Sequence, residues 1–368
     1  MKRLIFILLI SLTTATFAQK ISFSSQIVNS TDENIIAIRE QWKLYWVDCI
    51  KAYITKDEQI LSKYWDNVDI QHQYSSIAIN QLSDQIPIFF YGELVTYDMT
   101  KLDDEYFRLK TMVLMSDSIS KGVAADFTLF ATIKDNEVKF CSYFQKQLQT
   151  LITYSTAHID YYYPSNFTFD TNDAIKAENM LRELLQDFNI DKGRKITYIV
   201  STDIESANRL IGFDYSIHSS TSKNAGYFIK SSDMLFSCQV AHLHELVHVV
   251  VESKYPNVSR LFDEGIATYF GGSNGHEYKF HLKQLQEIIN NQANINFSKF
   301  DEWDKIIDNM TNPFYTIGAI FIDYAYKLGG QEKVESLLKS EDDINSTLEK
   351  ELGIDDANTF IKSYLKNE

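Results

Sequence analysis

Apolar residues recur at helical spacing in the first part of the chain. Between residues 32 and 54 this spacing predicts a helix with one buried face. The apolar positions on that face are Ile35, Ile38, Trp42, Tyr45 and Cys49. The segment Thr55-Lys56-Asp57-Glu58 then has the pattern of a capping box, which predicts that a second helix begins there and continues through Tyr64.

Beyond these helices the period of the apolar residues changes to two. Alternation of this kind predicts strands. The strand-like segments lie near 86–98, 105–115, 123–133 and 137–146, with a turn at Lys134-Asp135-Asn136. Helices followed by an antiparallel meander predict an α+β domain over residues 19–156. In its order of elements this domain resembles the cystatin-like fold of nuclear transport factor 2.

The pattern changes again after residue 156. It predicts a strand at 158–164, a helix at 172–188, a strand at 195–200, a short helix at 203–210 and a hairpin or edge strand at 224–237. The remainder to residue 368 is mostly helical in pattern. We therefore expect a second domain over residues 157–368, with a small sheet and a mostly helical C-terminal part. The whole chain is predicted to be of the α+β class.

Composition supports two globular domains and disfavours one class of partner. A chain of 368 residues is long for a single core, and 45% of its residues are apolar. The formal net charge is −15, which repels phosphate backbones, so nucleic acid is not an expected partner.

The first 18 residues have the pattern of a signal peptide. Lys2 and Arg3 form a basic start, residues 4–12 are apolar, and Thr16-Phe17-Ala18 has the small residues of a cleavage site. The alternative is an uncleaved membrane anchor, but this apolar run is short for a bilayer. No other segment approaches the length of a membrane span. We therefore expect export, either to a periplasm or out of the cell.

Candidate chemistry is concentrated in one predicted helix, residues 239–253. It contains His244-Glu245-Leu246-Val247-His248, in which two histidines stand four residues apart. Because four residues make slightly more than one helical turn, both imidazoles project from one face and can bind one Zn²⁺. Glu245 stands beside them and can hold a water molecule without itself binding the metal.

A second predicted helix, Leu261 to Phe270, supplies a third ligand. Its Glu264 follows His248 by enough residues for an antiparallel helix to bring the carboxylate back to the histidines. A charged residue in an apolar helix is costly unless a cation lies beside it. Gly265 and Ala267 are small, so we expect the two helices to pack closely.

These segments resemble the gluzincin zinc metallopeptidases, which include the aminopeptidase N group. The match consists of the His244-Glu245-x-x-His248 motif, the Phe262 to Tyr269 segment and Tyr315-Thr316-Ile317-Gly318. It implies that His244, His248 and Glu264 bind zinc and that Glu245 activates water. It also implies that Tyr315 stabilises the transition state, and that an edge strand containing Gly226 and Tyr227 pairs with a peptide or protein substrate.

The chain departs from the aminopeptidases at one point. These enzymes carry a Gly-x-Met-Glu-Asn segment whose glutamate holds the free amine of the substrate. The corresponding residues here, Ala225 to Ile229, contain no acid. Endopeptidase and exopeptidase action therefore both stay open.

Other histidines and polar residues near the motif have competing interpretations. His242 points away from the ligand face, so a packed or exposed residue is favoured over a fourth ligand. His276 and His281 are five residues apart, which favours a surface helix. Asp263 and Thr268 could each support a ligating histidine, and neither is favoured. The alternative for the whole chain is a catalytically inactive zinc-binding protein that acts as a binding or adhesion module.

Overall fold

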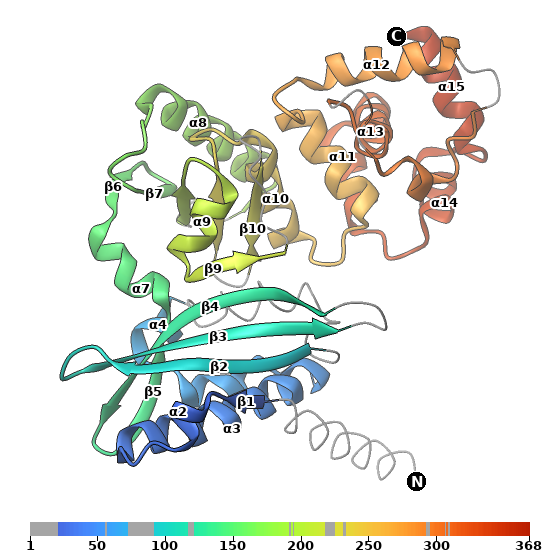
Figure 1. The fold of residues 1–368 in the computed structure, drawn as a ribbon. Helices are drawn as coiled ribbons and strands as arrows, with labels where there is room; N and C mark the ends of the chain where they lie inside the picture. Colours follow the sequence, from blue (N-terminus) through green and yellow to red (C-terminus); the bar gives the residue numbers. More distant parts are fainter. Residues whose placement is uncertain are drawn as a thin grey trace. The chain divides into compact units, whose positions relative to one another are not determined.

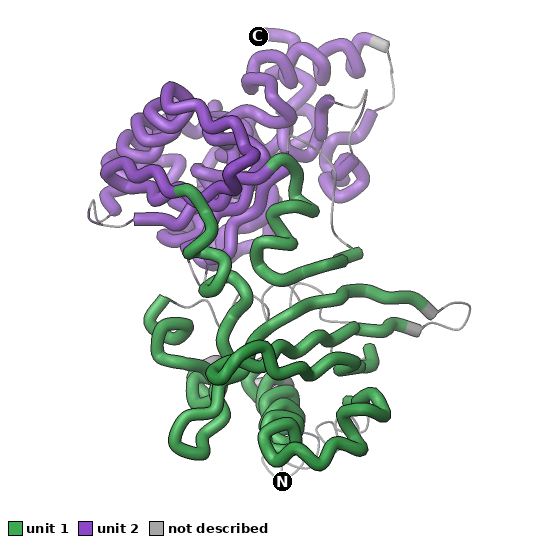
Figure 2. The backbone as a smooth tube through the Cα atoms, turned by 60° about the vertical axis from the view of Figure 1, so that its left-hand side comes forward, with its two compact units in different colours: residues 1–152, 202–222 green, residues 153–201, 223–368 purple. Residues whose placement is uncertain are grey.

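The computed structural model describes residues 21–55, 57–72, 92–116, 121–190, 193, 195–217, 225–230, 233–291, 295–305, 307 and 310–368. The predicted signal peptide and the first part of the strand near 86–98 lie outside the described residues. The chain forms two compact units, one of residues 1–152 and 202–222 and one of residues 153–201 and 223–368 (Figure 2). Each unit combines helices with a sheet, so the α+β class is confirmed (Figure 1).

The first unit is built on a sheet in the order β1-β2-β3-β4-β5, with β9 also paired to β4. The strands are β1 (Ile21–Phe23), β2 (Gly92–Lys101), β3 (Tyr106–Ser116), β4 (Lys121–Lys134), β5 (Glu137–Cys141) and β9 (Phe213–Ser216). Only β1 runs parallel to its neighbour. The predicted turn between β4 and β5 is confirmed, with positive φ angles of 52° at Asp135 and 63° at Asn136.

A long helix, α3 (Glu33–Thr55), covers one face of this sheet, and the predicted helix at 32–54 is confirmed (Figure 1). Its Trp42 is fully buried, and the indole Nε1 donates a hydrogen bond to Thr96 Oγ1 on β2 at 2.9 Å. The Trp42 ring also lies 5.0 Å from the Phe140 ring on β5. The short α2 (Ser25–Val28) precedes α3.

The predicted capping box is wrong. The chain stays helical through Thr55, and the next element is a 3₁₀ helix, η1 (Glu58–Tyr64). Its cap is Asp57, whose side chain accepts a hydrogen bond from the Gln59 backbone N–H at 3.2 Å. Asp and Thr are both good caps, so the local pattern does not decide between them. A further helix, α4 (Asn67–Gln71), follows.

The strand predicted at 137–146 is too long. β5 ends at Cys141, and Ser142 caps the helix α7 (Tyr143–Gln147) by accepting a hydrogen bond from the Gln145 backbone N–H at 3.2 Å. Side-chain capping by serine competes with sheet pairing, and alternation of apolar residues does not reveal it. The 3₁₀ helix η2 (Leu148–Thr150) completes this connection.

Residues 202–222 return to the first unit after the second has begun. They contain α9 (Ile204–Leu210) and β9, which pairs antiparallel with β4 through Phe213 and Phe127. Gly212 precedes the strand with a φ of 97°, and an added Cβ there would lie 2.5 Å from the Thr128 carbonyl oxygen. The division predicted from the sequence, 19–156 and 157–368, contains no such return.

The second unit has a smaller sheet in the order β10-β11-β8-β7-β6. The strands are β6 (Ile152–Ser155), β7 (Ile159–Tyr163), β8 (Ile196–Val200), β10 (Gly226–Ile229) and β11 (Met234–Ser237). α8 (Thr171–Asp187) connects the parallel strands β7 and β8. β11 is parallel to β8. β10 pairs antiparallel with β11 at the end of the sheet, which confirms the hairpin predicted at 224–237.

The rest of the second unit is mostly helical, as predicted. Its helices are α10 (Leu243–Lys254), α11 (Arg260–Gly271), α12 (Tyr278–Asn291), η4 (Phe300–Trp303), α13 (Pro313–Lys339), α14 (Ile344–Thr347), η5 (Leu348–Leu352) and α15 (Ala357–Asn367). α13 has non-helical backbone at Gly329 and Gly330, which divides it into two helical parts. Within the described residues, no helix is long and apolar enough to cross a bilayer.

α10 begins at Leu243, so the helix predicted over 239–253 starts too early. The Tyr198 hydroxyl donates to the Gln239 carbonyl oxygen at 2.7 Å and accepts from the His242 backbone N–H at 3.1 Å. Ser237 Oγ accepts from the Gln239 backbone N–H at 3.0 Å. These side chains hold the backbone before Leu243 in a turn, which the apolar pattern of the helix does not reveal.

Candidate metal centre

The helix α10 carries both predicted histidine ligands on one face. His244 and His248 are buried, with exposed fractions of 8% and 7%, and their ring centroids lie 4.9 Å apart. The other faces of the helix are held by fully buried apolar residues, which are Leu246, Val247, Val249, Val250 and Val251. Packing around the helix therefore fixes the direction in which the imidazoles project.

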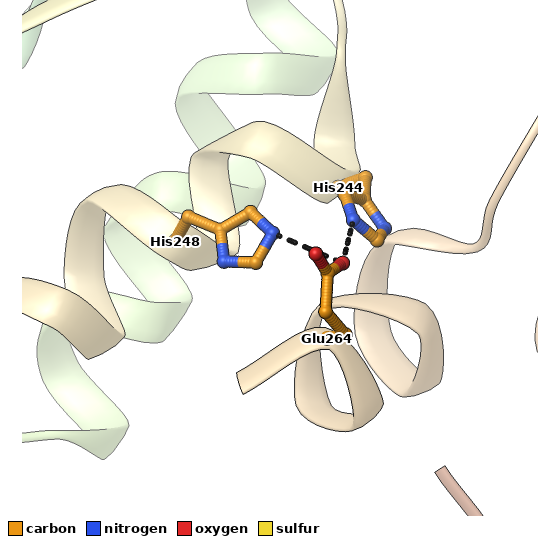
Figure 3. A group of neighbouring side chains, drawn as sticks. All are labelled: His244, His248 and Glu264. Carbon is orange, nitrogen blue, oxygen red and sulfur yellow. Dashed lines mark hydrogen bonds and ion pairs between the residues drawn. The ribbon is translucent and has the colours of Figure 1, made fainter. Parts of the chain in front are cut away.

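α11 folds back and presents Glu264 to the two rings (Figure 3). Glu264 Oε2 lies 3.2 Å from His244 Nε2 and 3.7 Å from His248 Nε2. One ligand atom from each residue can be chosen so that all three lie within 4.8 Å of one another. The structure thus brings together the three residues that the sequence predicts as metal ligands.

Electrostatics favour a charged carboxylate between the rings. Burial alone would raise the pKa of Glu264, but hydrogen bonds from His244 and His248 hold that pKa well below its ordinary value. Burial alone would lower the pKa of His248, but the Asp263 and Glu264 carboxylates raise it well above its ordinary value. A carboxylate and two imidazoles this close together can share protons, and in their deprotonated form they can bind a metal cation instead.

The outward-facing nitrogen of each histidine has its own contact. His244 Nδ1 donates a hydrogen bond to the Gly272 carbonyl oxygen at 2.7 Å, which directs its Nε2 toward Glu264. His248 Nδ1 lies 3.1 Å from Asp263 Oδ2, an ion-pair contact without the angle of a linear hydrogen bond. Of the two open alternatives, Asp263 therefore contacts a ligand. The Thr268 hydroxyl has no hydrogen-bond partner among the described residues.

Glu245 lies in the same cleft as the candidate ligands but outside their group. The cleft has a volume of about 410 Å³. Glu245 also lies against β10, because a Cβ added to Gly226 would be 2.8 Å from Glu245 Cγ. A carboxylate beside a metal-binding group, with its own access to the cleft, can accept a proton from a water molecule held there.

Tyr315 also lines this cleft. It stands in the first turn of α13, where Pro313 is the first helical residue and the Asn312 side chain accepts from the Phe314 backbone N–H at 3.0 Å. Its ring is nearly parallel to the His244 ring, 5.9 Å away. The pKa of the Tyr315 hydroxyl is raised above its ordinary value, mainly by burial and secondly by the nearby Glu264 carboxylate. The phenol therefore stays protonated at neutral pH and can donate a hydrogen bond.

Gly265 packs against a different helix from the one that the sequence predicts. A Cβ on Gly265 would lie 2.4 Å from the Gly318 carbonyl carbon, so Gly265 faces α13 and not α10. The close approach of α11 to α10 occurs instead at Gly271, where a Cβ would lie 2.4 Å from the His244 backbone nitrogen. The prediction that Gly265 allows α10 and α11 to pack closely is therefore wrong, because a helix more distant in sequence occupies that face.

The predicted substrate strand lies along the cleft. Gly226 and Tyr227 belong to β10, the last strand in the sheet order, and both line the cavity. The Tyr227 ring stacks on the Phe236 ring of β11 with centroids 4.9 Å apart. Gly226 leaves no room for a side chain, because a Cβ would lie 2.4 Å from His242 Nδ1. The missing side chain lets β10 approach the histidine–glutamate motif.

His242 is not in the groups of possible metal ligands. It precedes α10 and lines the same cleft, so the prediction that it points away from the ligand face is wrong. Its Nδ1 lies 2.9 Å from Ser237 Oγ, and burial lowers the pKa of the ring to about 4. His276 and His281 differ from the prediction of a surface helix. α12 begins only at Tyr278, and His281 is buried, with its ring nitrogens 2.9 Å from Thr311 Oγ1 and 2.8 Å from the Ser273 carbonyl oxygen.

Sequence reasoning missed Glu252, which lines the cleft beyond His248. Its Oε1 lies 4.0 Å from His248 Nδ1, and burial, with the Asp263 charge, raises the pKa of its carboxyl to about 7. A signal was present, because Glu252 follows His248 by the same four residues that separate His248 from His244. Ser273 and Asn274, from the loop after α11, line the cleft as well and carry no recognisable pattern.

Another group of candidate ligands lies in the first unit and consists of Asp66, Asp69 and Cys141. Asp69 accepts hydrogen bonds from the Ser142 backbone N–H at 2.7 Å and from Ser142 Oγ at 2.6 Å. Asp66 Oδ1 caps the Asp69 backbone N–H at 2.8 Å. These bonds join α4 to the start of α7, so the cluster has a structural explanation.

The cleft of the second unit holds two overlapping groups of possible ligands: His244, His248 and Glu264, and His248, Glu252 and Asp263. The first is the group that the sequence predicts, with two imidazoles and a carboxylate whose atoms converge in a cavity. Comparison with known proteins adds no assignment. No protein-family model matches the chain, and no curated protein matches it.

Proposed function

We propose that this protein is a zinc-dependent peptidase of the gluzincin type. The observation that carries the proposal is the convergence of His244 Nε2, His248 Nε2 and Glu264 Oε2 in a cleft that Glu245 also lines. Two histidines and one glutamate, with open space beside them, are a donor set typical of catalytic zinc. The residues present therefore fit the metal that the sequence predicts.

Zinc held by these three residues would lower the pKa of a bound water and polarise the carbonyl of a peptide bond. The chain's own residues would do the rest. Glu245 would accept the proton of the attacking water and deliver it to the leaving amine. Tyr315, protonated at neutral pH, would donate a hydrogen bond to the carbonyl oxygen as negative charge develops on it.

Binding of the substrate would use the edge of the sheet. β10 is the last strand in its sheet and runs along the cleft, so an extended peptide could add to it as a further strand. Gly226 keeps this strand close to Glu245. A peptide aligned in this way would lie with its backbone carbonyls next to the metal-binding group.

The metal assignment is tested by elemental analysis of the purified protein. We expect one zinc per chain in the wild type and loss of zinc in His244→Ala and Glu264→Ala, because each change removes a ligand. His276→Ala is the matched control and should keep its zinc, since His276 is not in the ligand group. Wild-type protein without zinc after purification in zinc-containing buffer, or full zinc in both ligand variants, would contradict the assignment.

The activity is tested by digestion of a broad peptide library. We expect new peptide termini with the zinc-loaded protein, none after treatment with a chelator, and recovery when zinc is returned. Zinc-loaded protein that cleaves nothing in the library would favour the alternative of a binding or adhesion module.

A further inference from the structure

The cleft does not end at the metal-binding residues. A second cavity, of about 650 Å³, adjoins the first. Four residues line both cavities, and they are His242, His244, Ser273 and Asn274. Because His244 is one of the candidate ligands, open space lies on both sides of this residue.

The edge strand lines the first cavity and lies against a residue that lines both. Residues 225–228 line the first cavity, and at the Gly226 end the strand lies against the His242 ring, which lines both. A peptide chain paired alongside β10 and extended beyond Gly226 would therefore enter the second cavity. The same peptide, followed the other way, would remain in the first cavity along Tyr227 and Phe228.

The second cavity can accommodate side chains. Each cavity alone is within the range of about 300–1,000 Å³ that is usual for drug-sized ligands. The second is lined by aromatic rings (Tyr269, Phe270 and Tyr278), by two lysines (Lys176 and Lys279) and by the glycines of the loop after α11. Polar residues, Glu277 and His276 among them, complete the lining. A cavity with both polar and apolar surface can accommodate peptide side chains of either kind.

Removal of the amino-terminal residue places a different demand on a cleft. The peptide must end close to the metal, and a fixed carboxylate must hold its free amine. The residues of β10, Gly226 to Ile229, include no acid. Glu252 and Asp263 are the carboxylates in the first cavity that have no role in the proposed reaction, and both lie against His248 Nδ1, at 4.0 Å and 3.1 Å. Neither lines the second cavity.

We infer that this site cleaves internal bonds of polypeptides, with substrate residues in both cavities at once. The inference rests on the proposed peptidase function and names its substrate class, an extended polypeptide segment with no requirement for a free end. Binding energy from residues on both sides of the cleaved bond would then contribute to catalysis.

The experiment uses zinc-loaded full-length protein and the best-cleaved peptide of the library in four forms. One has free ends, one is acetylated and amidated, and two are truncated to a single residue on either side of the cleaved bond. We expect capping to change kcat/KM less than about tenfold, and each truncation to lower it by at least about tenfold, because remote binding energy is lost. Loss of cleavage on amino-terminal capping, or release of terminal residues only, would overturn the inference.

A pair of variants tests the second cavity itself. Lys279→Glu reverses a charge in its lining, whereas Lys283→Glu reverses a charge one turn further along α12, outside the residues that line either cavity. A peptide with an acidic residue on the side of the second cavity should be cleaved several-fold more slowly by Lys279→Glu and at the wild-type rate by Lys283→Glu. Equal rates in both variants would contradict occupation of that cavity.

Failure of this inference differs from failure of the proposed function. Zinc-loaded protein that cleaves none of the four peptide forms and nothing in the library would contradict peptidase activity itself. Cleavage that depends on a free amino end would leave the peptidase proposal standing and reject internal cleavage.

Discussion

Tyr315 shows how one side chain can be distinguished from the other tyrosines of the chain. It lies in the cleft beside His244, and the Glu264 carboxylate adds to burial in raising the pKa of its hydroxyl. Tyr324, on the same helix, packs instead against Phe360, with ring centroids 4.7 Å apart. Both are aromatic residues of α13, but only Tyr315 is among the residues that line the candidate site.

Replacement of Tyr315 by phenylalanine tests its proposed contact with the developing negative charge. We expect Tyr315→Phe to lower kcat roughly 10²-fold, a loss of about 3 kcal/mol, with KM and zinc content little changed. Tyr324→Phe is the matched control and should retain wild-type kcat. Steady-state kinetics on one library peptide measures both variants. An unchanged kcat in folded, zinc-loaded Tyr315→Phe would leave this residue with a packing role only.

At the scale of elements, the site depends on the crossing of α11 and α13. Gly265 and Gly318 meet at this crossing, and a Cβ on Gly318 would lie 2.1 Å from the Leu261 carbonyl oxygen. Glu264 directly precedes Gly265, and Tyr315 stands one turn before Gly318. The close backbone contact therefore sets the distance between a candidate metal ligand and a candidate catalytic residue.

A single methyl group at the crossing should disturb both residues. We expect Gly318→Ala to lower the free energy of unfolding by about 1–3 kcal/mol, because overpacked helices must separate. Zinc affinity should fall as Glu264 moves, which competition with a chromophoric chelator would measure. Gly122→Ala is the control, since no atom lies within 4 Å of a Cβ placed there. Wild-type stability and zinc affinity in Gly318→Ala would show that the crossing does not constrain the site.

The elements that were predicted correctly are those whose signals are local. The α3 helix has its buried face in one run of sequence, and the turn at Asp135 and Asn136 depends on adjacent residues. His244 and His248 are likewise one helical turn apart, so their shared face follows from helix geometry alone. Glu252 shares this spacing and could have been found in the same way.

Two of the features that were missed depend on contacts between distant residues. Gly265 meets Gly318, and no pattern around either glycine identifies the other. The start of α10 is displaced by the Tyr198 hydroxyl, more than forty positions earlier, which bonds to His242 at a separation of 44 residues. Pairing partners at such distances are decided by tertiary packing, which local propensity does not contain.

At the scale of the whole molecule, the chain combines two units with separate cores. The first holds Trp42, Trp46 and Trp65 in its core, and the second contains the candidate metal centre. The chain leaves the second unit at residue 202 and returns to it at 223. Pairing of β9 with β4 explains this path, because β9 extends the sheet of the first unit. The three proposed zinc ligands, the cleft and β10 nonetheless all belong to the second unit.

The central claim is that Glu245 acts as the base of a zinc peptidase, and Glu245→Gln tests it most directly. The amide is close in shape to the carboxylate but cannot accept the proton of water. Wild type and variant, each checked for zinc content, are compared on the same library peptide. We expect equal zinc in both proteins and turnover lower in the variant by roughly 10²–10⁴-fold. Cleavage by zinc-loaded Glu245→Gln at near the wild-type rate would contradict this account.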